Sequence, residues 1–290
     1  MNIRTFSIVA GSLACNARCD FCIAGMTPKN GLGTKEPEVK WQRFKQACQL
    51  ARDGGCSTAM ITSKGEPTIF PDQITKFLEI LAEYKFPIIE MQTNGLLIAE
   101  GKKVTDEHLK RWAELGLTTV AVSVVHYDAE KNKSIYTKTR PYMDLEALIA
   151  KLHRFGFSVR LTTILAKGYI DSPAELQKML DFAAKNKVEQ LTATPVTKPD
   201  DSENKQIFSW TSQHALSKEE FGAIKSYVEL NGSLVLELAH GARVYDVHGQ
   251  NLCLSNCITV DPNAKEMRSI IFFPDGHVRY AWQYSGAILF

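Results

Sequence analysis

This 290-residue sequence has little net charge, and it lacks long apolar runs and recognisable targeting segments. Its 34 Lys and Arg residues are offset by 32 Asp and Glu residues, so the formal net charge is only +2. A charge this small gives no strong indication of a nucleic-acid partner or an anionic membrane surface. No segment reaches the roughly 18 consecutive apolar residues of a membrane span, and the first 13 residues lack the pattern of a secretory signal. We therefore expect a cytoplasmic protein without membrane attachment.

The sequence also lacks short repeats and low-complexity tracts, and it contains an odd number of cysteines. Apolar residues make up 44% of the chain and charged residues 23%, which is typical of a globular protein. The length suits one large domain, or one domain with a small appendage. Seven cysteines, three near the start and two near the end, favour reduced thiols and metal ligation over a disulfide framework.

The three early cysteines lie close together. Cys15, Cys19 and Cys22 are spaced four and then three residues apart, and Phe21 directly precedes the last of them. Three thiolates on one loop can bind three irons of an iron-sulfur cube and leave the fourth iron open. A structural zinc ion would need a fourth Cys or His nearby, and residues 23–40 contain neither. The spacing therefore indicates a cluster with an open position for chemistry.

Short β-rich runs alternate with helical periodicity up to about residue 195. This alternation predicts an α/β fold of repeated βα units around a parallel sheet. The expected strands are Thr5–Val9, Thr58–Thr62, Ile88–Thr93, Thr119–Val125, Val159–Leu165 and Gln190–Pro195. Six such units indicate a partial (β/α)6 TIM barrel over residues 1–197.

A polar, turn-rich stretch, Lys198–Lys205, follows the sixth strand and is a candidate boundary. Residues 198–290 are expected to form a small α+β extension that caps the barrel mouth. We predict that it contains a helix opening at Ser217–Glu220, a strand at Leu234–Leu238 and a hairpin across Pro274–Gly276.

Candidate functional segments follow four of the predicted strands. The cysteine loop follows the first strand, Ser63–Pro67 follows the second, Thr93–Gly95 follows the third, and Ser123 lies near the end of the fourth. In parallel β/α barrels, the loops after the strands converge on one mouth. We therefore expect these segments at a common rim.

The run from Cys15 to Cys22 matches the C-x3-C-x-aromatic-C signature of radical S-adenosylmethionine (radical SAM) enzymes, and the chain resembles that superfamily. The resemblance is nearest in character to the molybdenum-cofactor cyclic-pyranopterin synthase and SPASM-twitch branch. It implies that the three cysteines bind a 4Fe-4S cluster and that S-adenosylmethionine chelates its fourth iron. Reductive cleavage of the cofactor then yields a 5'-deoxyadenosyl radical that abstracts hydrogen from a substrate. Such an enzyme is oxygen-sensitive and needs a reductant such as flavodoxin or ferredoxin.

The resemblance also implies cofactor-binding residues around the cysteine loop. Gly65-Glu66-Pro67 resembles the end of the G-G-E-P motif, which holds the methionyl amino group in relatives, and Lys64 replaces its first glycine. The other implied cofactor contacts are Phe21, Thr93, Asn94, Ser123, Thr163 and Ile164. Taken alone, Gly-Glu-Pro and Asn-Gly are also common turns, and any barrel core needs apolar contacts on its fifth strand.

Three residues are candidates for substrate chemistry. Lys64 can bind substrate at the rim. Arg140 lies in a segment similar to the arginine-containing loop of the molybdenum-cofactor branch and can grip a carboxylate or phosphate; a solvated surface arginine is the alternative. His126 can contact substrate or donate a proton, and a hydrogen-bonded structural histidine is the alternative.

Cys253 and Cys257 resemble part of the cysteine trio that holds an auxiliary cluster in the cyclic-pyranopterin synthase branch. The third cysteine is missing. The pair is therefore two ordinary buried cysteines, a degenerate site, or a cluster or zinc site completed by a histidine such as His248 or His277. Two thiols are below the usual ligand count, so the sequence leaves a second cluster open without favouring it.

The combined features predict a radical SAM enzyme that acts on a small-molecule or nucleotide-like substrate. One alternative is modification of a ribosomally made peptide by the same chemistry. A second alternative, from another class, is a non-catalytic interaction protein in which the cysteine loop binds zinc.

Overall fold

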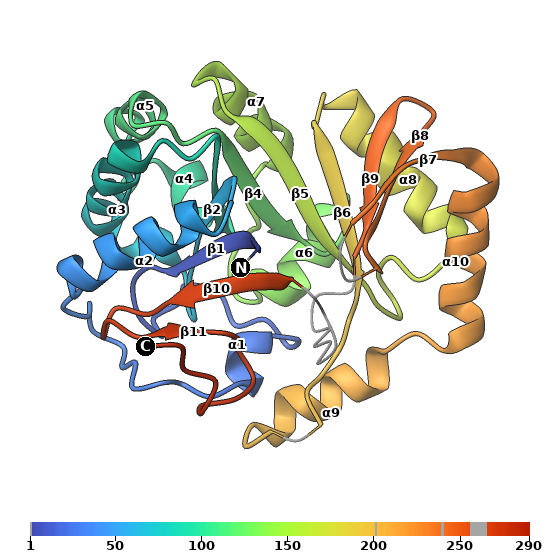
Figure 1. Ribbon diagram of the computed structural model, residues 1–290. Coiled ribbons are helices and arrows are strands. Elements are labelled where there is room, and N and C mark those ends of the chain that lie inside the picture. The colour runs from blue at the N-terminus through green and yellow to red at the C-terminus, as the bar shows by residue number, and fades with distance from the viewer. Residues whose placement is uncertain (1, 201, 239–240, 256–265) are drawn as a thin grey trace.

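The computed structural model describes residues 2–200, 202–238, 241–255 and 266–290. Their strands form one sheet with the order β11-β10-β1-β2-β3-β4-β5-β6-β9-β8-β7. Adjacent strands from β10 through to β9 are parallel, and antiparallel strands flank them at both edges. Within the described residues the sheet curves without closing, as in a partial TIM barrel, and helices cover its outer side (Figure 1).

The elements alternate as βα units through the first six strands. The strands are β1 (Ile3–Val9), β2 (Thr58–Thr62), β3 (Ile88–Thr93), β4 (Thr119–Val124), β5 (Ser158–Leu165), β6 (Gln190–Pro195), β7 (Gly232–Glu237), β8 (Arg243–Val247), β9 (Gln250–Leu254), β10 (Met267–Phe272) and β11 (Val278–Arg279). The helices are α1 (Ile23–Met26), α2 (Trp41–Asp53), the 3-10 helix η1 (Pro67–Ile69), α3 (Pro71–Tyr84), α4 (Leu96–Glu100), α5 (Asp106–Glu114), α6 (Ala129–Tyr136), α7 (Leu145–Arg154), α8 (Pro173–Lys185), α9 (Lys205–His214) and α10 (Lys218–Asn231). None of the described helices has both the length and the apolar character needed to cross a bilayer.

The main core lies between the sheet and its outer helices. Phe44 and Cys48 of α2 and Phe77 of α3 are fully buried against the sheet, because apolar residues recur on one face of each helix. Cys56 is also a fully buried core residue. The outward-facing residues of the strands complete this core.

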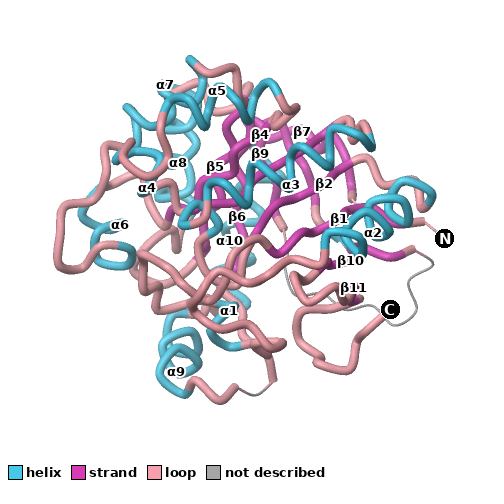
Figure 2. Tube along the Cα trace, turned by 90° about the vertical axis from the view of Figure 1, so that its left-hand side faces the viewer, coloured by secondary structure: helices cyan, strands magenta, loops and turns pink. Residues whose placement is uncertain are grey.

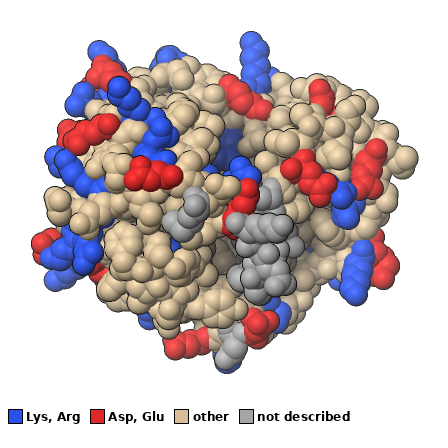
Figure 3. Space-filling view, in the orientation of Figure 1, with Lys and Arg blue, Asp and Glu red and all other residues tan. Residues whose placement is uncertain are grey.

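The inner face of the sheet is polar. Residues that alternate with the core-facing ones point the other way, and Thr62 on β2 donates a hydrogen bond to Gln92 on β3 at 3.1 Å. Glu90 on β3 is buried and forms an ion pair with Arg160 on β5. The molecular face in Figure 3 is hollowed near its centre, and basic side chains are visible inside the hollow.

Two helices lie at the end of the barrel where the parallel strands finish. Figure 2 shows α1 and α9 together below the sheet, and the two helices are in contact. Helix α1 follows the cysteine loop directly, whereas α9 belongs to the region after β6. The C-terminal region therefore reaches the barrel mouth through α9.

All six strands expected in the first part of the chain are present, so the predicted α/β partial barrel is confirmed. In the region 198–290, the predicted helix, strand and hairpin correspond to α10, β7 and the β10–β11 pair. The parallel pairing of β10 with β1 and of β9 with β6 was not predicted. The C-terminal region thus adds strands to both edges of the barrel sheet.

Candidate active site

The cysteine loop leaves β1 at the carboxyl edge of the sheet and turns into α1. The amide of Cys22 donates to the carbonyl of Cys19 at 3.2 Å, and Gly25 donates to the carbonyl of Cys22 at 3.0 Å. Cys15 is exposed, and Cys19 and Cys22 are half-buried free thiols. Among the described residues, no three Cys, His, Asp or Glu side chains converge on one metal ion. The three thiols thus share a loop without the close spacing of a single-zinc site.

Although the Cys15 side chain reaches the surface, surrounding protein atoms partly desolvate its thiol and raise its pKa to about 11, and the nearby Glu66 and Cys22 raise it further. Burial also raises the pKa of Cys19, with Cys22 and Cys15 adding to the effect. These mutual effects arise because the three sulfurs are close enough to interact electrostatically. Iron ligation by thiolates releases these protons.

Gly65 brings the loop after β2 into contact with the cysteine loop. The amide of Glu66 donates to the carbonyl of Ala14 at 2.9 Å. A Cβ atom on Gly65 would lie 2.1 Å from that same carbonyl oxygen and 2.7 Å from the carbonyl oxygen of Ser12. Only glycine permits this approach of two backbones. The glycine of the Gly-Glu-Pro turn is therefore required by the contact with the cysteine loop, and not only by the turn itself.

Glu66 joins the same loop to the end of β3. Its buried carboxylate accepts hydrogen bonds from the Thr93 hydroxyl at 2.6 Å and from the Asn94 amide at 2.9 Å. The hydroxyl and the amide of Thr68 donate to it as well, at 2.5 and 3.1 Å. Burial raises the pKa of Glu66, and these hydrogen bonds lower it. The carboxylate therefore braces two neighbouring rim loops.

Asn94 connects β3 to the cysteine loop. Its Nδ2 donates to Oδ1 of Asn16 at 2.7 Å and lies 4.0 Å from Sγ of Cys15. Its Oδ1 accepts from the amide of Leu96 at 3.0 Å, which starts α4. Nδ2 of Asn16 is buried without a hydrogen-bond partner within the described structure. The predicted rim segments after β1, β2 and β3 are thus in direct contact.

Aromatic side chains pack against the cysteine loop. We call them the aromatic wall, and they are Phe21, Tyr136, Tyr142 and Trp210. Phe21 packs edge-on against Tyr136 of α6, with ring centroids 6.5 Å apart, and against Trp210 of α9 at 5.9 Å. The Tyr142 ring lies 6.0 Å from the Tyr136 ring at a tilt of 32°, and its hydroxyl is buried with no partner among the described atoms. Burial raises the pKa of both tyrosines, and the Cys19 thiol adds to the effect. The sequence did not single out Tyr136 and Trp210 as partners of Phe21, nor Tyr142 as a neighbour of Tyr136.

The two residues expected on β5 point to opposite faces. Ile164 packs with Phe21 and its aromatic neighbours. Thr163 is fully buried and lies on the same side of the strand as Leu161 and Leu165, which belong to the main core. Ser123 on β4 is half-buried and lies next to Thr162 in the sheet register. Ile164 and Ser123 therefore face the interior, whereas Thr163 faces the helices.

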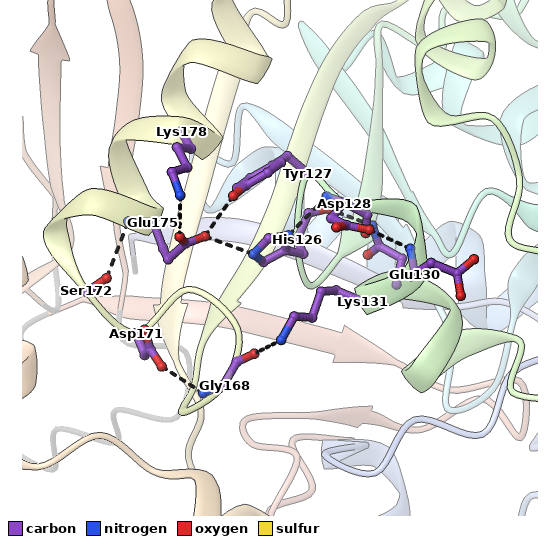
Figure 4. A network of polar contacts seen from close by, with 11 residues as sticks. His126, Tyr127, Asp128, Glu130, Lys131, Gly168, Asp171, Ser172, Glu175 and Lys178 are labelled. Carbon is purple, nitrogen blue, oxygen red and sulfur yellow. Dashed lines mark hydrogen bonds and ion pairs between the residues drawn. The ribbon is translucent and has the colours of Figure 1, made fainter.

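His126 is held inside a polar network between β4 and α8 (Figure 4). Its Nδ1 accepts a hydrogen bond from the amide of Asp128 at 3.0 Å, so the proton is on Nε2, which donates to Glu175 at 3.1 Å. Glu175 also accepts from the Tyr127 hydroxyl at 2.9 Å and binds Lys178. Burial lowers the pKa of His126 despite the neighbouring Glu175. Both ring nitrogens are thus occupied by protein groups.

Lys64 and Arg140 lie in different environments. Lys64 is only 5% exposed, and its Nζ donates to Oγ1 of Thr27, behind Cys22. Arg140 is exposed and lines an open surface cavity of about 430 Å³ between α4 and α7. Of the two basic candidates, the structure brings only Lys64 to the cysteine loop.

Cys253 lies on β9, and its register partner on β6 is Thr192. It is buried on the inner face, where the positive charge of Arg160 partly offsets the rise in its pKa caused by burial. Cys257, the second cysteine of the predicted auxiliary site, lies outside the described residues. The described part of the chain contains no cluster of ligands around Cys253.

Comparisons with known proteins identify the family of this chain. Residues 11–183 match the family model of the radical SAM superfamily. A GTP 3',8-cyclase from Aquifex aeolicus (strain VF5) is 25% identical over 174 residues, covering 58% of this chain and 48% of the cyclase. The chain thus spans about half the length of that relative.

Solved structures share the fold over nearly the whole chain. SuiB from Streptococcus suis bound to S-adenosylmethionine has a TM-score of 0.64 and 15% identity, covering 97% of this chain and 60% of SuiB. The enzyme anSMEcpe with bound AdoMet has a TM-score of 0.62 and 12% identity, covering 100% of this chain and 74% of that chain. The match to the family model shows that the chain belongs to the radical SAM superfamily, a class of enzymes that use a 4Fe-4S cluster and S-adenosylmethionine as cofactors.

Proposed function

We propose that Cys15, Cys19 and Cys22 hold the 4Fe-4S cluster and that the adjoining rim holds S-adenosylmethionine. The observation that carries this assignment is the contact between three rim loops: Glu66 with the Ala14 carbonyl, Glu66 with the end of β3, and Asn94 with the cysteine loop. The three thiols fit a cluster because they are free and lie on one short loop, and no single-ion site forms from them in the described structure. When bound, the cluster and its cofactor supply a 5'-deoxyadenosyl radical.

The polar side of the pocket suits the amino-acid and ribose parts of the cofactor. Gly65, Glu66 and Pro67 offer backbone groups beside the cysteine loop, and the orphaned Nδ2 of Asn16 offers a further donor. The side chains of Thr93, Asn94 and Ser123 stand along the adjoining strand ends. Short hydroxyl and amide groups in a partly dry pocket suit a carboxylate and a sugar diol.

The aromatic wall suits the adenine ring. Phe21 and Ile164 belong to one apolar cluster with Tyr136, and Trp210 of α9 covers it. These side chains exclude water from the site, which limits side reactions of a radical. Thr163 is assigned to packing against the helices because it lies on the outer face of β5.

The polar inner face of the barrel best suits a small, polar molecule or a nucleotide as substrate. The inner face carries Thr62, Gln92 and the Glu90–Arg160 pair, which offer donors and acceptors inside the barrel. A filled TIM-barrel core would carry bulky branched side chains at such positions. Modification of a peptide is the second candidate, because SuiB, whose fold this chain shares, has been solved bound to its precursor peptide SuiA. A low-potential one-electron donor such as flavodoxin or ferredoxin completes the proposed system.

Anaerobic reconstitution tests the cluster assignment. The wild-type chain should bind about four irons and four sulfides and form 5'-deoxyadenosine when S-adenosylmethionine and reductant are added. Cys19→Ala should lose the cluster and the product, whereas the buried-cysteine control Cys48→Ala should keep both if it folds. Turnover by Cys19→Ala at the wild-type rate contradicts the assignment.

The iron count after reconstitution also tests whether Cys253 belongs to an auxiliary cluster. One cluster per chain gives about four irons, and an auxiliary cluster raises the count to about eight. Cys253→Ala should leave the iron count unchanged if the chain holds one cluster. A drop by about four irons in this variant would show an auxiliary cluster.

A further inference from the structure

Lys64 is a buried cation beside the cysteine loop. Its side chain is 5% exposed at the end of β2, in the position where the family motif has a glycine. No carboxylate of the described residues lies within ion-pair distance of its Nζ. A buried ammonium without a counter-ion is costly, so its retention at this point needs a partner.

Thr27 fixes the direction of the ammonium. The Thr27 hydroxyl donates its proton to the carbonyl of Ile23 at 3.0 Å, so it acts only as an acceptor toward Lys64. Ile23 is the first residue of α1 and Thr27 directly follows the helix, whose N-cap residue is Cys22. Burial lowers the pKa of the Lys64 ammonium to about 8, and the nearby Cys22 thiol opposes this shift. The ammonium is therefore anchored next to one of the three proposed cluster ligands.

We propose that Lys64 is the counter-charge of the iron-sulfur cluster and raises its reduction potential in this chain. The inference rests on the proposed function, since it takes Cys22 as a cluster ligand. A cluster held by thiolates becomes more negative by one electron when a low-potential donor reduces it, and net charge and hydrogen bonds around it set its potential. The ammonium stabilises the reduced state more than the oxidised state. The proposed effect is that of a nearby positive charge and includes no proton transfer.

The role differs from substrate binding at the rim. The Lys64 ammonium points to the Thr27 hydroxyl, at the end of the helix that follows the cysteine loop. It is almost fully shielded from solvent. It is a positioning residue that acts through the cluster. Its removal therefore changes a redox equilibrium of the protein even when no substrate is present.

A redox titration followed by electron paramagnetic resonance tests the proposal on the reconstituted full chain. At equal applied potential, Lys64→Gln should lower the ratio of reduced to oxidised cluster roughly tenfold, because a charge a few ångströms away in a poorly solvated site interacts strongly. Tenfold corresponds to 59 mV for a one-electron couple. The control Lys29→Gln removes the same charge from an exposed position two residues after Thr27, where solvent screens it, and should change the ratio less than twofold.

The outcomes separate this proposal from the proposed function. A wild-type chain that binds no cluster overturns the proposed function. A Lys64→Gln variant with a full iron content and the wild-type potential overturns only the role of Lys64. If Lys64→Gln does not assemble the cluster, Thr27→Val decides the question, because it leaves the lysine in place and removes the group that anchors it. A lowered potential in Thr27→Val supports the proposal, and the wild-type potential overturns it.

Discussion

Replacing Gly65 by alanine tests the contact between two backbones on which the candidate site depends. The new Cβ atom would lie 2.1 Å from the Ala14 carbonyl oxygen, whereas real Cβ contacts are essentially never below 3.0 Å. Both crowding atoms are carbonyl oxygens, so no side chain can rotate to make room. The loop after β2 must therefore move away from the cysteine loop by close to an ångström.

That movement breaks the hydrogen bond between the Glu66 amide and the Ala14 carbonyl, now 2.9 Å long. A lost hydrogen bond with a buried unsatisfied group costs about 1–3 kcal/mol, and backbone strain at Gly65 adds about 1 kcal/mol or more. We therefore expect Gly65→Ala to lower the free energy of unfolding by about 2–4 kcal/mol. Because the unfolding entropy of a 290-residue chain is about 0.6 kcal/mol/K, the expected decrease in the thermal midpoint is roughly 3–7 °C.

Thermal unfolding of the metal-free protein, followed by circular dichroism, measures this effect without involving the cluster. Iron content after reconstitution then reports on the site and should also fall. Gly222→Ala is the matched control, because Gly222 lies within α10 and a Cβ atom there meets nothing within 4 Å. The control should keep or raise the midpoint. A Gly65→Ala variant with the wild-type midpoint and iron content would refute the reasoning.

Three other substitutions test the surroundings of the site. Glu66→Gln should destabilise the fold by about 1–3 kcal/mol, because its Nε2 would face the Asn94 amide with a second donor; equal unfolding midpoints in urea would contradict this. Burial lowers the folded-state pKa of His126, so the unfolded chain binds more protons below about pH 6.5 and stability should fall as the pH drops through that range. His126→Gln should flatten this part of the stability curve, and an unchanged slope counts against the network. Trp210→Ala should speed the bleaching of the cluster in air by opening the aromatic wall, while Phe208→Ala on the same helix should not.

The sequence predicted the parts of the fold that have local patterns. Each of the first six strands is a short β-rich run followed by a helix with one apolar face, so the order β1 to β6 follows from neighbouring segments. The pairing of β10 with β1 places Ile3 beside Met267. No local pattern specifies which strand a distant parallel strand will join, so the two added edges could not be read from the chain.

The candidate site also contains residues that short sequence motifs predicted and residues that they did not. The cysteines, Gly65 and Asn94 occur in short motifs after strands, and their convergence followed from the geometry of parallel sheets. Trp210 could not be found this way, because it reaches the cysteine loop from a helix beyond the sixth strand. The alternation of side chains along β5 was available in the sequence, and it excludes Thr163 and Ile164 from facing the same side.

The position of β10 has a consequence for how the chain is made. β1 carries the cysteine loop, and its two neighbours are β2, which follows within about sixty residues, and β10, which lies near the other end of the chain. Domains fold during synthesis from the N-terminus onward. On the ribosome, β1 is therefore an open edge strand until residues 267–272 have emerged. The three thiols on the loop after β1 therefore leave the ribosome more than 200 residues before the strand that completes their side of the sheet.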